Sequence, residues 1–427
     1  MFKNTNRRQF IKASAAASLV LSSPMLANAD GHGKPRLIIV GGGIGGATVA
    51  RYVAKQSKGA VDVILIEAHK RYTTCFFSNW YLADFRTFDS ITHDYLTLEG
   101  DYGIKVIHQY VTNIDADKKM VMLQDGSGIS YNKCVVASGI DFVWDSIPGH
   151  AAELSVDLPH AYKGGEQTII LKNQLNAMPD GGVFAMVAPP NPFRCPPGPY
   201  ERVSMVANYL KKNKPRSKII VLDHKEKFSK QALFEEAWAN HYDGMVEWIP
   251  ASISGAIQHV DAMKKTIKLE DEVVKADVIN LIPKQKSGNI AAVAGLTDDS
   301  GWCPIKDAET FASANVPDVH VLGDASINGA MPKSGFSANS QAKNVANAIL
   351  HELMGAKKYP ARFRNTCWSL VSDNDGIKVG ASYKADGAAV AKTDGFISKT
   401  GEGADLREQT KEEAISWYDG ITQDVFG

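Results

Sequence analysis

A glycine-rich stretch near the N-terminus constrains the fold of this chain more than any other feature. Residues 36–50 read RLIIVGGGIGGATVA, and their pattern predicts a buried parallel strand at Leu37 to Val40 and a helix from Ala47 to Lys55. Three of the glycines between them follow the spacing G-x-G-x-x-G: Gly41, Gly43 and Gly46. This order of strand, glycine loop and helix is typical of a dinucleotide-binding unit.

The glycine spacing has a chemical reason. One glycine permits the tight turn, the next lets a pyrophosphate approach the backbone, and the third lets helix and strand pack closely. The helix N-terminus then presents unpaired N–H groups to the phosphates. A second predicted strand, Val61 to Ile66, ends in Glu67, roughly 20 residues further on, where an acidic residue binds the ribose hydroxyls of the adenosine. We therefore predict a dinucleotide site rather than a glycine-rich loop without a ligand.

Charge and cysteine content exclude several classes of protein. The 47 Lys and Arg balance the 47 Asp and Glu, so no net charge points to nucleic acid or to an anionic membrane. The number of cysteines, five, and the absence of any C-x-x-C spacing fit neither a disulfide scaffold nor a zinc centre. No metal site is predicted. The haem signature C-x-x-C-H is also missing, so the chain is expected to carry no c-type haem of its own.

The first 29 residues have the pattern of a twin-arginine export signal. Arg7-Arg8 opens a basic segment, a mildly apolar run follows from Ala13 to Leu26, and Ala27-Asn28-Ala29 fits a small-residue cleavage site. No later stretch is long and apolar enough to span a bilayer. We expect a periplasmic protein without a transmembrane segment.

The rest of the first unit is predicted from shorter patterns. Ile104 to Ile107 and Lys119 to Leu123 resemble strands of a small antiparallel excursion. Tyr131 to Ile140 is predicted to return the chain to the first sheet. Near residue 320, the predicted strand Val319 to Leu322 ends in Gly323-Asp324, a position where FAD enzymes of this architecture place an aspartate on the ribityl chain.

A predicted helix follows this aspartate and runs to about Leu350. Pro332-Lys333-Ser334-Gly335 opens it, so its N-terminus and the Lys333 ammonium are candidates to stabilise negative charge at flavin N1 and O2. After Gly355, about 70 residues of mixed, glycine-rich sequence are expected to form a third, small domain.

The middle third departs from the dinucleotide pattern. Gly182 to Ala188 is again predicted as a strand and Tyr200 to Lys211 as a helix, but the residues between them read PPNPFRCPPGP. Prolines lack N–H donors, and side chains here block close approach of a pyrophosphate. Lys218 to Leu222 and Ala276 to Ile282 complete a doubly wound unit. We predict a nicotinamide-type fold that has lost its NAD(P)H site.

These patterns together predict an α/β protein with two doubly wound Rossmann-like domains, as in glutathione-reductase-like flavoproteins, and a small C-terminal α+β domain. The predicted division is an FAD domain at 36–150 and 284–355, a nicotinamide-domain-like unit at 151–283, and a C-terminal flavin and interface domain at 356–427.

Over essentially its whole mature length, the chain resembles the flavoprotein subunit of flavocytochrome c sulfide dehydrogenase. The residues that carry the resemblance are VGGGIGGAT, YTTCFFSN, PFRCPPGPYE, GDASI with MPKSGFSANSQ, NTCWSL and the terminal SWY. PFRCPPGPYE is the most specific of these strings, because no general requirement of the fold dictates it.

The resemblance assigns roles to individual residues. It implies that Cys75 holds FAD covalently through the 8α-methyl group, and that Cys195 and Cys367 form a redox disulfide beside the isoalloxazine. Glu201 and Trp417 match an acid and an aromatic residue that line the same site. On the residues alone, Cys75 among aromatics is also compatible with a core position, and Glu201 with a surface carboxylate. Two cysteines match no catalytic role and are expected to be buried thiols: Cys134 and Cys303.

The chemistry of these groups fits sulfide oxidation. Hydrosulfide is a small nucleophile and a disulfide sulfur is a good electrophile for it, so attack on the Cys195–Cys367 bond gives a persulfide and a thiolate. The resemblance implies that two electrons then reach FAD, that zero-valent sulfur or polysulfide is released, and that a c-type cytochrome subunit carrying haem c takes the electrons one at a time in a heterodimer.

Two other functions remain open on the sequence. A sulfide:quinone oxidoreductase shares the fold and the cysteine-pair logic, although its apolar C-terminal helices differ from the short, mostly polar segment Lys411 to Gly427. An accessory flavoprotein that supports a thiosulfate-oxidising complex also resembles this family closely.

Overall fold

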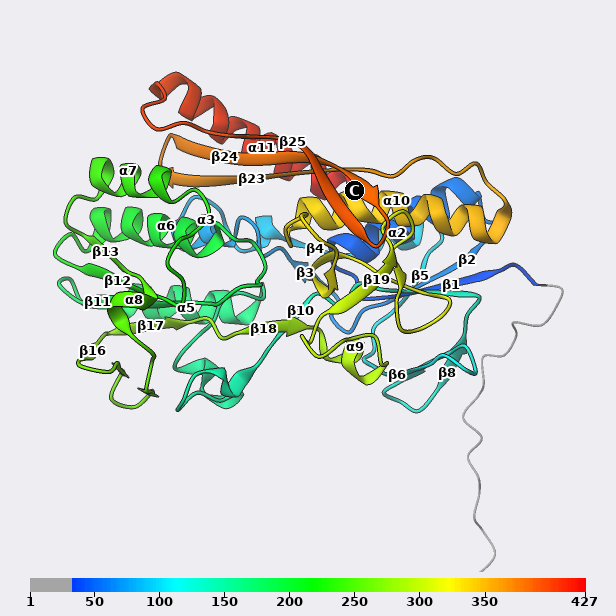
Figure 1. Ribbon diagram of the computed structural model, residues 1–427, viewed down its shortest axis with the longest axis horizontal. Coiled ribbons are helices and arrows are strands. Elements are labelled where there is room, and N and C mark those ends of the chain that lie inside the picture. The colour runs from blue at the N-terminus through cyan, green and yellow to red at the C-terminus, as the bar shows by residue number, and fades with distance from the viewer. Residues whose placement is uncertain (1–32) are drawn as a thin grey trace, which may run out of the picture.

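The computed structural model describes residues 33–427, and the export signal predicted at residues 1–29 lies outside the described residues. Two α/β units stand side by side, and a C-terminal layer of strands and one helix lies across both (Figure 1). The predicted α/β fold class is confirmed by the two parallel sheets and by the solved structures described below.

The first unit is built on an eight-stranded sheet in the order β22-β19-β20-β21-β9-β1-β2-β5. Its parallel core consists of β21 (Val319–Val321), β9 (Lys133–Val136), β1 (Arg36–Val40), β2 (Asp62–Ile66) and β5 (Lys105–Ile107). β19 (Cys303–Asp307), β20 (Ala312–Ser313) and β22 (Ser326–Ile327) extend one edge, with β20 antiparallel to both neighbours. β1, β2 and β9 are apolar and buried after their first residues, as in a parallel sheet that is covered on both faces.

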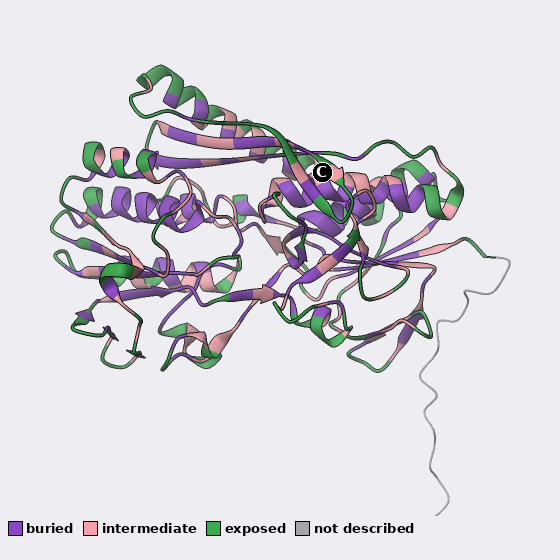
Figure 2. Ribbon diagram, in the orientation of Figure 1, coloured by how far each residue is buried: buried purple, intermediate pink, exposed green. Residues whose placement is uncertain are grey.

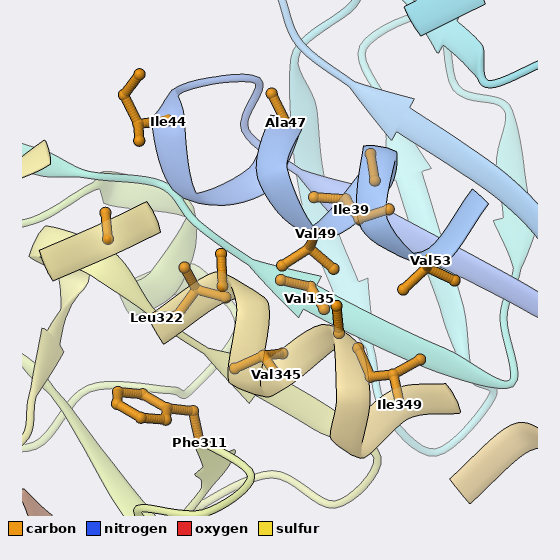
Figure 3. Packing of buried hydrophobic residues seen from close by; sticks show 14 of the residues in the cluster. Ile39, Ile44, Ala47, Val49, Val53, Val135, Phe311, Leu322, Val345 and Ile349 are labelled. Carbon is orange, nitrogen blue, oxygen red and sulfur yellow. The ribbon is translucent and has the colours of Figure 1, made fainter. Parts of the chain in front are cut away.

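Two helices cover one face of this sheet. α2 (Ile44–Ser57) and α10 (Gly335–Met354) pack against each other, and their apolar side chains meet those of the strands (Figure 3). Ile39, Val49, Val135 and Val345 are fully buried in this cluster. Burying one such side chain contributes about 1.5–3 kcal/mol, so this packing holds the glycine loop between β1 and α2 in place.

Helix α2 begins three residues earlier than predicted, at Ile44 instead of Ala47, with Gly43 as its N-cap. The physical reason is the third glycine of the motif. A Cβ on Gly46 would lie 1.9 Å from the Gly41 carbonyl oxygen, so the absent side chain lets the first helical turn close directly onto the loop. Helix α10 likewise ends at Met354, four residues beyond the predicted Leu350, where Gly355 adopts a left-handed conformation (φ 67°).

The assignment of Ile104 to Ile107 to the antiparallel excursion is wrong. These residues form β5, which pairs in parallel with β2 at the edge of the main sheet. The excursion consists of β6 (Val111–Asp115), β7 (Met120–Leu123) and β8 (Gly128–Ser130). A run of three or four apolar residues predicts a strand, but it does not predict the neighbouring strand, because register and pairing depend on the rest of the fold.

The second unit contains a four-stranded parallel sheet in the order β13-β12-β11-β17. Its strands are β13 (Val246–Ile249), β12 (Lys218–Asp223), β11 (Val183–Ala188) and β17 (Val278–Leu281), and its main helices are α5 (Glu166–Ala177), α6 (Gly198–Asn213) and α7 (Gln231–His241). A meander of β14 (His259–Asp261), β15 (Thr266–Lys268) and β16 (Val273–Lys275) precedes β17. The predicted doubly wound unit is thus present.

The two connections between the units pair with each other. β10 (Ile140–Phe142) leads out of the first unit and β18 (Gln285–Ser287) leads back, and they form an antiparallel two-stranded sheet. Shorter elements complete the part of the chain that is described: β3 (Tyr72–Thr73), β4 (Thr92–His93), α3 (Ser78–Leu82), α4 (Leu96–Gly100), α8 (Ala251–Ser254) and α9 (Asn289–Val293).

The C-terminal layer is more regular than its sequence suggested. It is an antiparallel sheet of β23 (Arg362–Ser372), β24 (Asp375–Asp386) and β25 (Ala389–Ile397), followed by the 23-residue helix α11 (Ala404–Phe426). β23 contacts α6 and α7 of the second unit and α10 of the first, and its residues alternate between buried and less buried positions along its first half (Figure 2). Between residues 33 and 427, no helix combines the length and apolarity that crossing a bilayer requires.

Candidate functional site

A cavity of about 790 Å³, counting its open mouth, lies where the two units and the C-terminal layer meet. It is lined by five of the residues that the sequence singled out: Cys75, Cys195, Glu201, Cys367 and Trp417. They come from the segment before α3, the loop before α6, α6 itself, β23 and α11. Residues nearly 350 positions apart in the chain are therefore brought into one site.

Cys75 stands just before α3 and is partly buried. The carbonyl oxygen of Cys75 accepts hydrogen bonds from the Ser78 backbone N–H (3.3 Å) and hydroxyl (2.5 Å), which fix the turn into the helix. Burial raises the pKa of the Cys75 thiol, and the charge of the nearby Arg194 guanidinium opposes that rise. The next residue, Phe76, packs against Trp417 with ring centroids 5.2 Å apart. Cys75 is thus a cavity residue and not a core residue.

Cys195 lies in the proline-rich loop in a left-handed conformation (φ 56°). Its N–H donates to the Lys333 carbonyl oxygen (2.8 Å), and its own carbonyl accepts from the Tyr162 hydroxyl (3.1 Å). Cys367 sits in β23, where the Asn365 amide donates to its sulfur at 3.4 Å. Burial raises the pKa of both thiols.

All five cysteines are free thiols in this structure. The predicted pair, Cys195 and Cys367, shares the cavity without a bond, and the disulfide between them stays a prediction. Cys134 and Cys303 are fully buried outside the cavity, as expected for structural thiols. Burial raises the pKa of Cys303 to about 11, which keeps that thiol protonated at neutral pH.

Glu201 is an interior residue, so the interpretation as a surface carboxylate is wrong. It is 9% exposed and accepts hydrogen bonds from the Asn79 amide (2.9 Å), the Trp80 indole N–H (3.2 Å) and the Leu370 backbone N–H (3.0 Å). Burial raises its pKa even though these hydrogen bonds and the Lys230 charge favour the carboxylate. A carboxyl of this kind can hold or release a proton inside the cavity.

The glycine loop leaves no room for side chains, so its backbone can be approached closely by a pyrophosphate. A Cβ on Gly42 would lie 2.6 Å from the Tyr95 hydroxyl, and Gly41 adopts φ 102°. Glu67 lies at the end of β2 as predicted, where its carboxylate accepts from the Gly42 N–H (2.8 Å) and the His69 N–H (3.0 Å). The N-cap of α2, Gly43, provides no side-chain cap, which leaves the first-turn N–H groups to a ligand.

Asp324 also has the features of a ligand-binding residue. Its Oδ1 is buried and has no hydrogen-bond partner among the described residues, while Oδ2 lies 3.5 Å from the Arg194 guanidinium. A buried, unsatisfied carboxylate oxygen is costly unless a ligand pairs with it. A ribityl hydroxyl has the donor that this oxygen lacks, so the residues present fit FAD.

Lys333 points away from the start of α10. Its ammonium donates to the carbonyl oxygens of Asp324 (2.9 Å) and Ser326 (2.5 Å) and lies 3.8 Å from the centroid of the Trp302 ring. Burial lowers its pKa to about 8. The N-terminus of α10 is capped by the Ser334 hydroxyl, which accepts from the Ser337 N–H at 3.0 Å. The contact of Lys333 with flavin N1 and O2 stays a prediction.

The second unit also has an acidic residue at the end of its second strand, which the sequence analysis missed. Asp223 is 2% exposed, and its carboxylate accepts from the hydroxyl of Tyr200 (2.5 Å), the indole of Trp248 (3.0 Å) and the ammonium of Lys225 (2.5 Å). Tyr200 in turn stacks on Phe228 with centroids 3.7 Å apart. The carboxylate that would meet a ribose in a nicotinamide domain is engaged in the core.

Three buried cations of the site were also missed. Arg202 binds the carbonyls of His160 and Ala161 and the side chains of Asn79 and Asn280, and burial lowers its pKa to about 10. Arg194 stands beside Cys195 in the motif PFRC, so its neighbourhood in the sequence could have revealed it. Lys230 reaches the Cys367 backbone from the start of α7, and no local pattern marks it. Among residues 33–427, no cluster of His, Cys, Asp or Glu is arranged to hold a metal ion.

Comparisons with known proteins agree with this geometry. Three family profiles match: "Sulfide dehydrogenase [flavocytochrome c] flavoprotein chain, central" at residues 168–283, "Flavocytochrome c sulphide dehydrogenase, flavin-binding" at residues 359–426, and "Pyridine nucleotide-disulphide oxidoreductase" at residues 35–169. The matched flavin-binding region supports FAD as the cofactor.

Individual relatives point the same way. The chain is 43% identical over 47 residues, which is 11% of its length, to the flavocytochrome c sulfide dehydrogenase flavoprotein chain of Chlorobaculum thiosulfatiphilum, of whose sequence it covers 96%. It is 24% identical over 337 residues to a mitochondrial sulfide:quinone oxidoreductase of Dictyostelium discoideum, covering 74% of this chain and 71% of that protein.

A solved structure establishes the fold independently. The sulfide:quinone oxidoreductase of Aquifex aeolicus superposes with a TM-score of 0.71 and 17% identity over 92% of each chain. The architecture is that of an α/β flavoprotein oxidoreductase. With the matched profiles and the Chlorobaculum thiosulfatiphilum relative, this shows that the chain belongs to the flavoprotein chains of flavocytochrome c sulfide dehydrogenase, a family of sulfide-oxidising flavoproteins.

Proposed function

We propose that this chain oxidises sulfide to zero-valent sulfur or polysulfide in the periplasm and passes the electrons to a c-type cytochrome subunit. One observation carries the proposal: Cys75, Cys195 and Cys367 come from three parts of the chain and line one cavity. One of these thiols is available to hold the flavin, and the other two can form a redox disulfide.

The proposed reaction begins with a disulfide between Cys195 and Cys367. Hydrosulfide attacks one sulfur, which forms a persulfide on that cysteine and releases the other as a thiolate. A second hydrosulfide removes the outer sulfur of the persulfide as HSS⁻ and leaves a thiol. Closing the disulfide again releases two electrons and one proton. In sum, two hydrosulfide ions give HSS⁻, one proton and two electrons.

FAD supplies the acceptor for those two electrons and can pass them on one at a time, as a haem requires. The residues that would hold it are the glycine loop with Glu67 at the adenosine end, Asp324 at the ribityl chain, and Cys75, as a covalent link, at the ring. Trp417 lies beside Phe76 on the wall of the same cavity.

Glu201 is suited to move protons in this reaction. It lies in the cavity with both cysteines, and burial raises its pKa above the ordinary value of a carboxyl. Hydrosulfide and the thiols release protons where bulk water has little access. We assign Glu201 the role of carrying them out of the cavity.

Cytochrome, rather than a nicotinamide, is the proposed electron partner. The proline loop and the engaged Asp223 carboxylate argue against an NAD(P)H site in the second unit. The predicted export signal would place the chain in the periplasm, where c-type cytochromes accept electrons. The family itself is named for a flavocytochrome, which supports a haem-bearing subunit.

A quinone is the second candidate acceptor, because the sulfide:quinone oxidoreductases of Dictyostelium discoideum and Aquifex aeolicus resemble this chain. The two acceptors are distinguished by supplying purified holoprotein and sulfide with either a c-type cytochrome or a soluble quinone. Turnover with cytochrome and none with quinone supports the first proposal, and the reverse result supports the second.

The sulfide chemistry is tested by Cys367→Ser. We expect this variant to bind FAD but to lose flavin bleaching by anaerobic sulfide, because the disulfide can no longer form. The matched control is Cys303→Ser, a buried cysteine outside the cavity whose neighbour Ser287 can pair with the new hydroxyl. Undiminished bleaching in Cys367→Ser would overturn the disulfide mechanism.

A further inference from the structure

Lys230 is a buried ammonium that faces the two cavity thiols. It precedes α7 in the second unit with φ 63°, and its side chain crosses to the C-terminal layer. There Nζ donates to the carbonyl oxygen of Cys367 (3.1 Å), the hydroxyl of Ser369 (2.8 Å) and the carbonyl oxygen of Ile377 (3.4 Å). The residue is 5% exposed.

No carboxylate among the described residues lies within 4.0 Å of this ammonium. An isolated buried charge is expensive, so proteins usually pair it with an opposite charge. The three partners of Lys230 are neutral, and the groups that can become anionic nearby are the thiols of Cys195 and Cys367 and the carboxyl of Glu201. The site therefore holds a cation with no direct ion-pair partner, close to thiols that can become anionic during reaction.

A second buried lysine, Lys214, has surroundings that explain its burial without any role in a reaction. Lys214 is 8% exposed and donates to the carbonyl oxygens of Leu175, Asn176 and Met178. Those carbonyls belong to the C-terminal end of α5, where a cation is stabilised by the helix dipole. Lys230 instead meets carbonyls of two strands, which offer no such field, and it stands beside thiols.

We propose that Lys230 is a positioning residue that stabilises the thiolate released at the Cys195–Cys367 pair. When hydrosulfide opens the disulfide, the attacked cysteine gains an outer sulfur as a persulfide, and the other leaves with the electron pair of the broken S–S bond. That negative charge appears inside a water-poor cavity, and the fixed ammonium lowers its cost. The inference rests on the proposed role of the two cysteines.

The charges around the thiols support this assignment. The Lys230 charge lowers the pKa of both Cys195 and Cys367 against the rise that burial causes, and burial lowers the pKa of Lys230 itself to about 8. Other titratable or charged groups also face these thiols from the elements packed around them: Glu201, Cys75, Tyr162, Arg202 and Tyr383. Of the cations Lys230 and Arg202, it is Lys230 that contacts the Cys367 backbone.

The test is the thiol titration of the reduced, FAD-bound protein, read as the pH dependence of iodoacetamide alkylation on the Cys195 and Cys367 peptides by mass spectrometry. Lys230→Gln keeps hydrogen-bond donors but removes the charge, and we expect the alkylation profile of at least one thiol to move about one pH unit or more to higher pH. Lys230→Arg keeps the charge and is expected to restore the wild-type profile. Lys230→Met replaces Lys230→Gln if the latter loses FAD.

Lys214→Met is the matched control, since it removes a buried lysine far from any cavity thiol, and its profile should equal that of the wild type. An unchanged profile in both neutral Lys230 variants overturns the inference. Alkylation needs no sulfide, so this failure is distinct from failure of the proposed function. Failure of the proposed function would appear in wild-type protein as a flavin that is not bleached by sulfide.

Discussion

The hydroxyl of Tyr200 donates a 2.5 Å hydrogen bond to the carboxylate of Asp223, at the strand end where a nicotinamide domain would bind ribose. The two residues are buried, and the stacked ring of Phe228 covers Tyr200. A ligand that needed this carboxylate would have to break an interior hydrogen-bond network. The Asp223 carboxylate thus contributes to the packing of this unit.

We therefore predict that NADH and NADPH neither bind nor reduce the holoprotein. Under anaerobic conditions, sulfide should bleach the flavin absorbance, while either nicotinamide at millimolar concentration should leave it unchanged. Stopped-flow absorbance measures both reactions on the same sample. Flavin reduction by NADH as fast as that by sulfide would contradict this account of the second unit.

Covalent attachment of FAD at Cys75 is a second prediction. In wild-type protein, the yellow colour should remain with the acid-precipitated chain, and the peptide that contains Cys75 should carry the mass of FAD. In Cys75→Ser the flavin should be released into the supernatant, because a serine hydroxyl does not replace the thioether. Cys134→Ser serves as the control, since Cys134 is fully buried in the first sheet. Release of the flavin from acid-precipitated wild-type protein would show that Cys75 does not hold FAD covalently.

The glycine loop provides a third prediction. Gly46→Ala should lose FAD and reduce the free energy of unfolding by about 2 kcal/mol, because its Cβ would lie 1.9 Å from the Gly41 carbonyl oxygen and the backbone has to move. Flavin content and urea unfolding measure the two effects. Gly100→Ala is the control, as a Cβ there meets nothing within 4 Å. Equal behaviour of the two variants would mean that helix and strand do not pack as closely as described.

A partly exposed ion-pair network predicts acid sensitivity. Glu352 on α10 lies 2.6 Å from the Lys133 ammonium and 3.6 Å from the His320 imidazole, and its pKa is lowered to about 2, first by His320 and then by Lys133. A carboxylate with a depressed folded-state pKa contributes stability at pH values above its ordinary pKa, near 4.5, and this contribution is lost as the pH falls toward 2.

Glu352→Gln should therefore lower the free energy of unfolding by about 1–2 kcal/mol at pH 7, a range that allows for solvent screening of this partly exposed group. The difference from wild type should shrink steadily between pH 4.5 and pH 2. Denaturant unfolding at several pH values measures this. The exposed pair Lys358–Glu309 offers the control Glu309→Gln, which should change stability by no more than about 1 kcal/mol. A loss at pH 7 that persists unchanged at pH 2 would show that packing, not charge, is responsible.

The local patterns of the sequence predicted much of this fold. The strand before Gly41, the helix after it and the proline loop around Cys195 are all where the residues indicated, because each depends on neighbours in the chain. Asp223 was missed, although it is the last residue of β12 much as Glu67 follows β2, and the same interpretation was open there.

What the sequence did not reveal depends on distant packing. The parallel partner of β5 is set by the whole sheet, and the strand in which Cys367 lies was hidden in a segment that looked irregular. Lys230 carries no local signal at all, because only tertiary packing brings its ammonium to the backbone of Cys367 in β23 and of Ile377 in β24. Glu201 was placed in the site by resemblance, while its burial followed only from the structure.

The three cavity thiols come from three separate segments of the chain, so the site depends on a complete polypeptide. Cys75, Cys195 and Cys367 belong to three separately coloured parts of Figure 1, and the last of them joins the site only when β23 settles across the other two. An unfinished or clipped polypeptide that lacks this strand has no partner for Cys195. Under the proposed mechanism, competence toward sulfide therefore depends on complete synthesis and on the docking of β23.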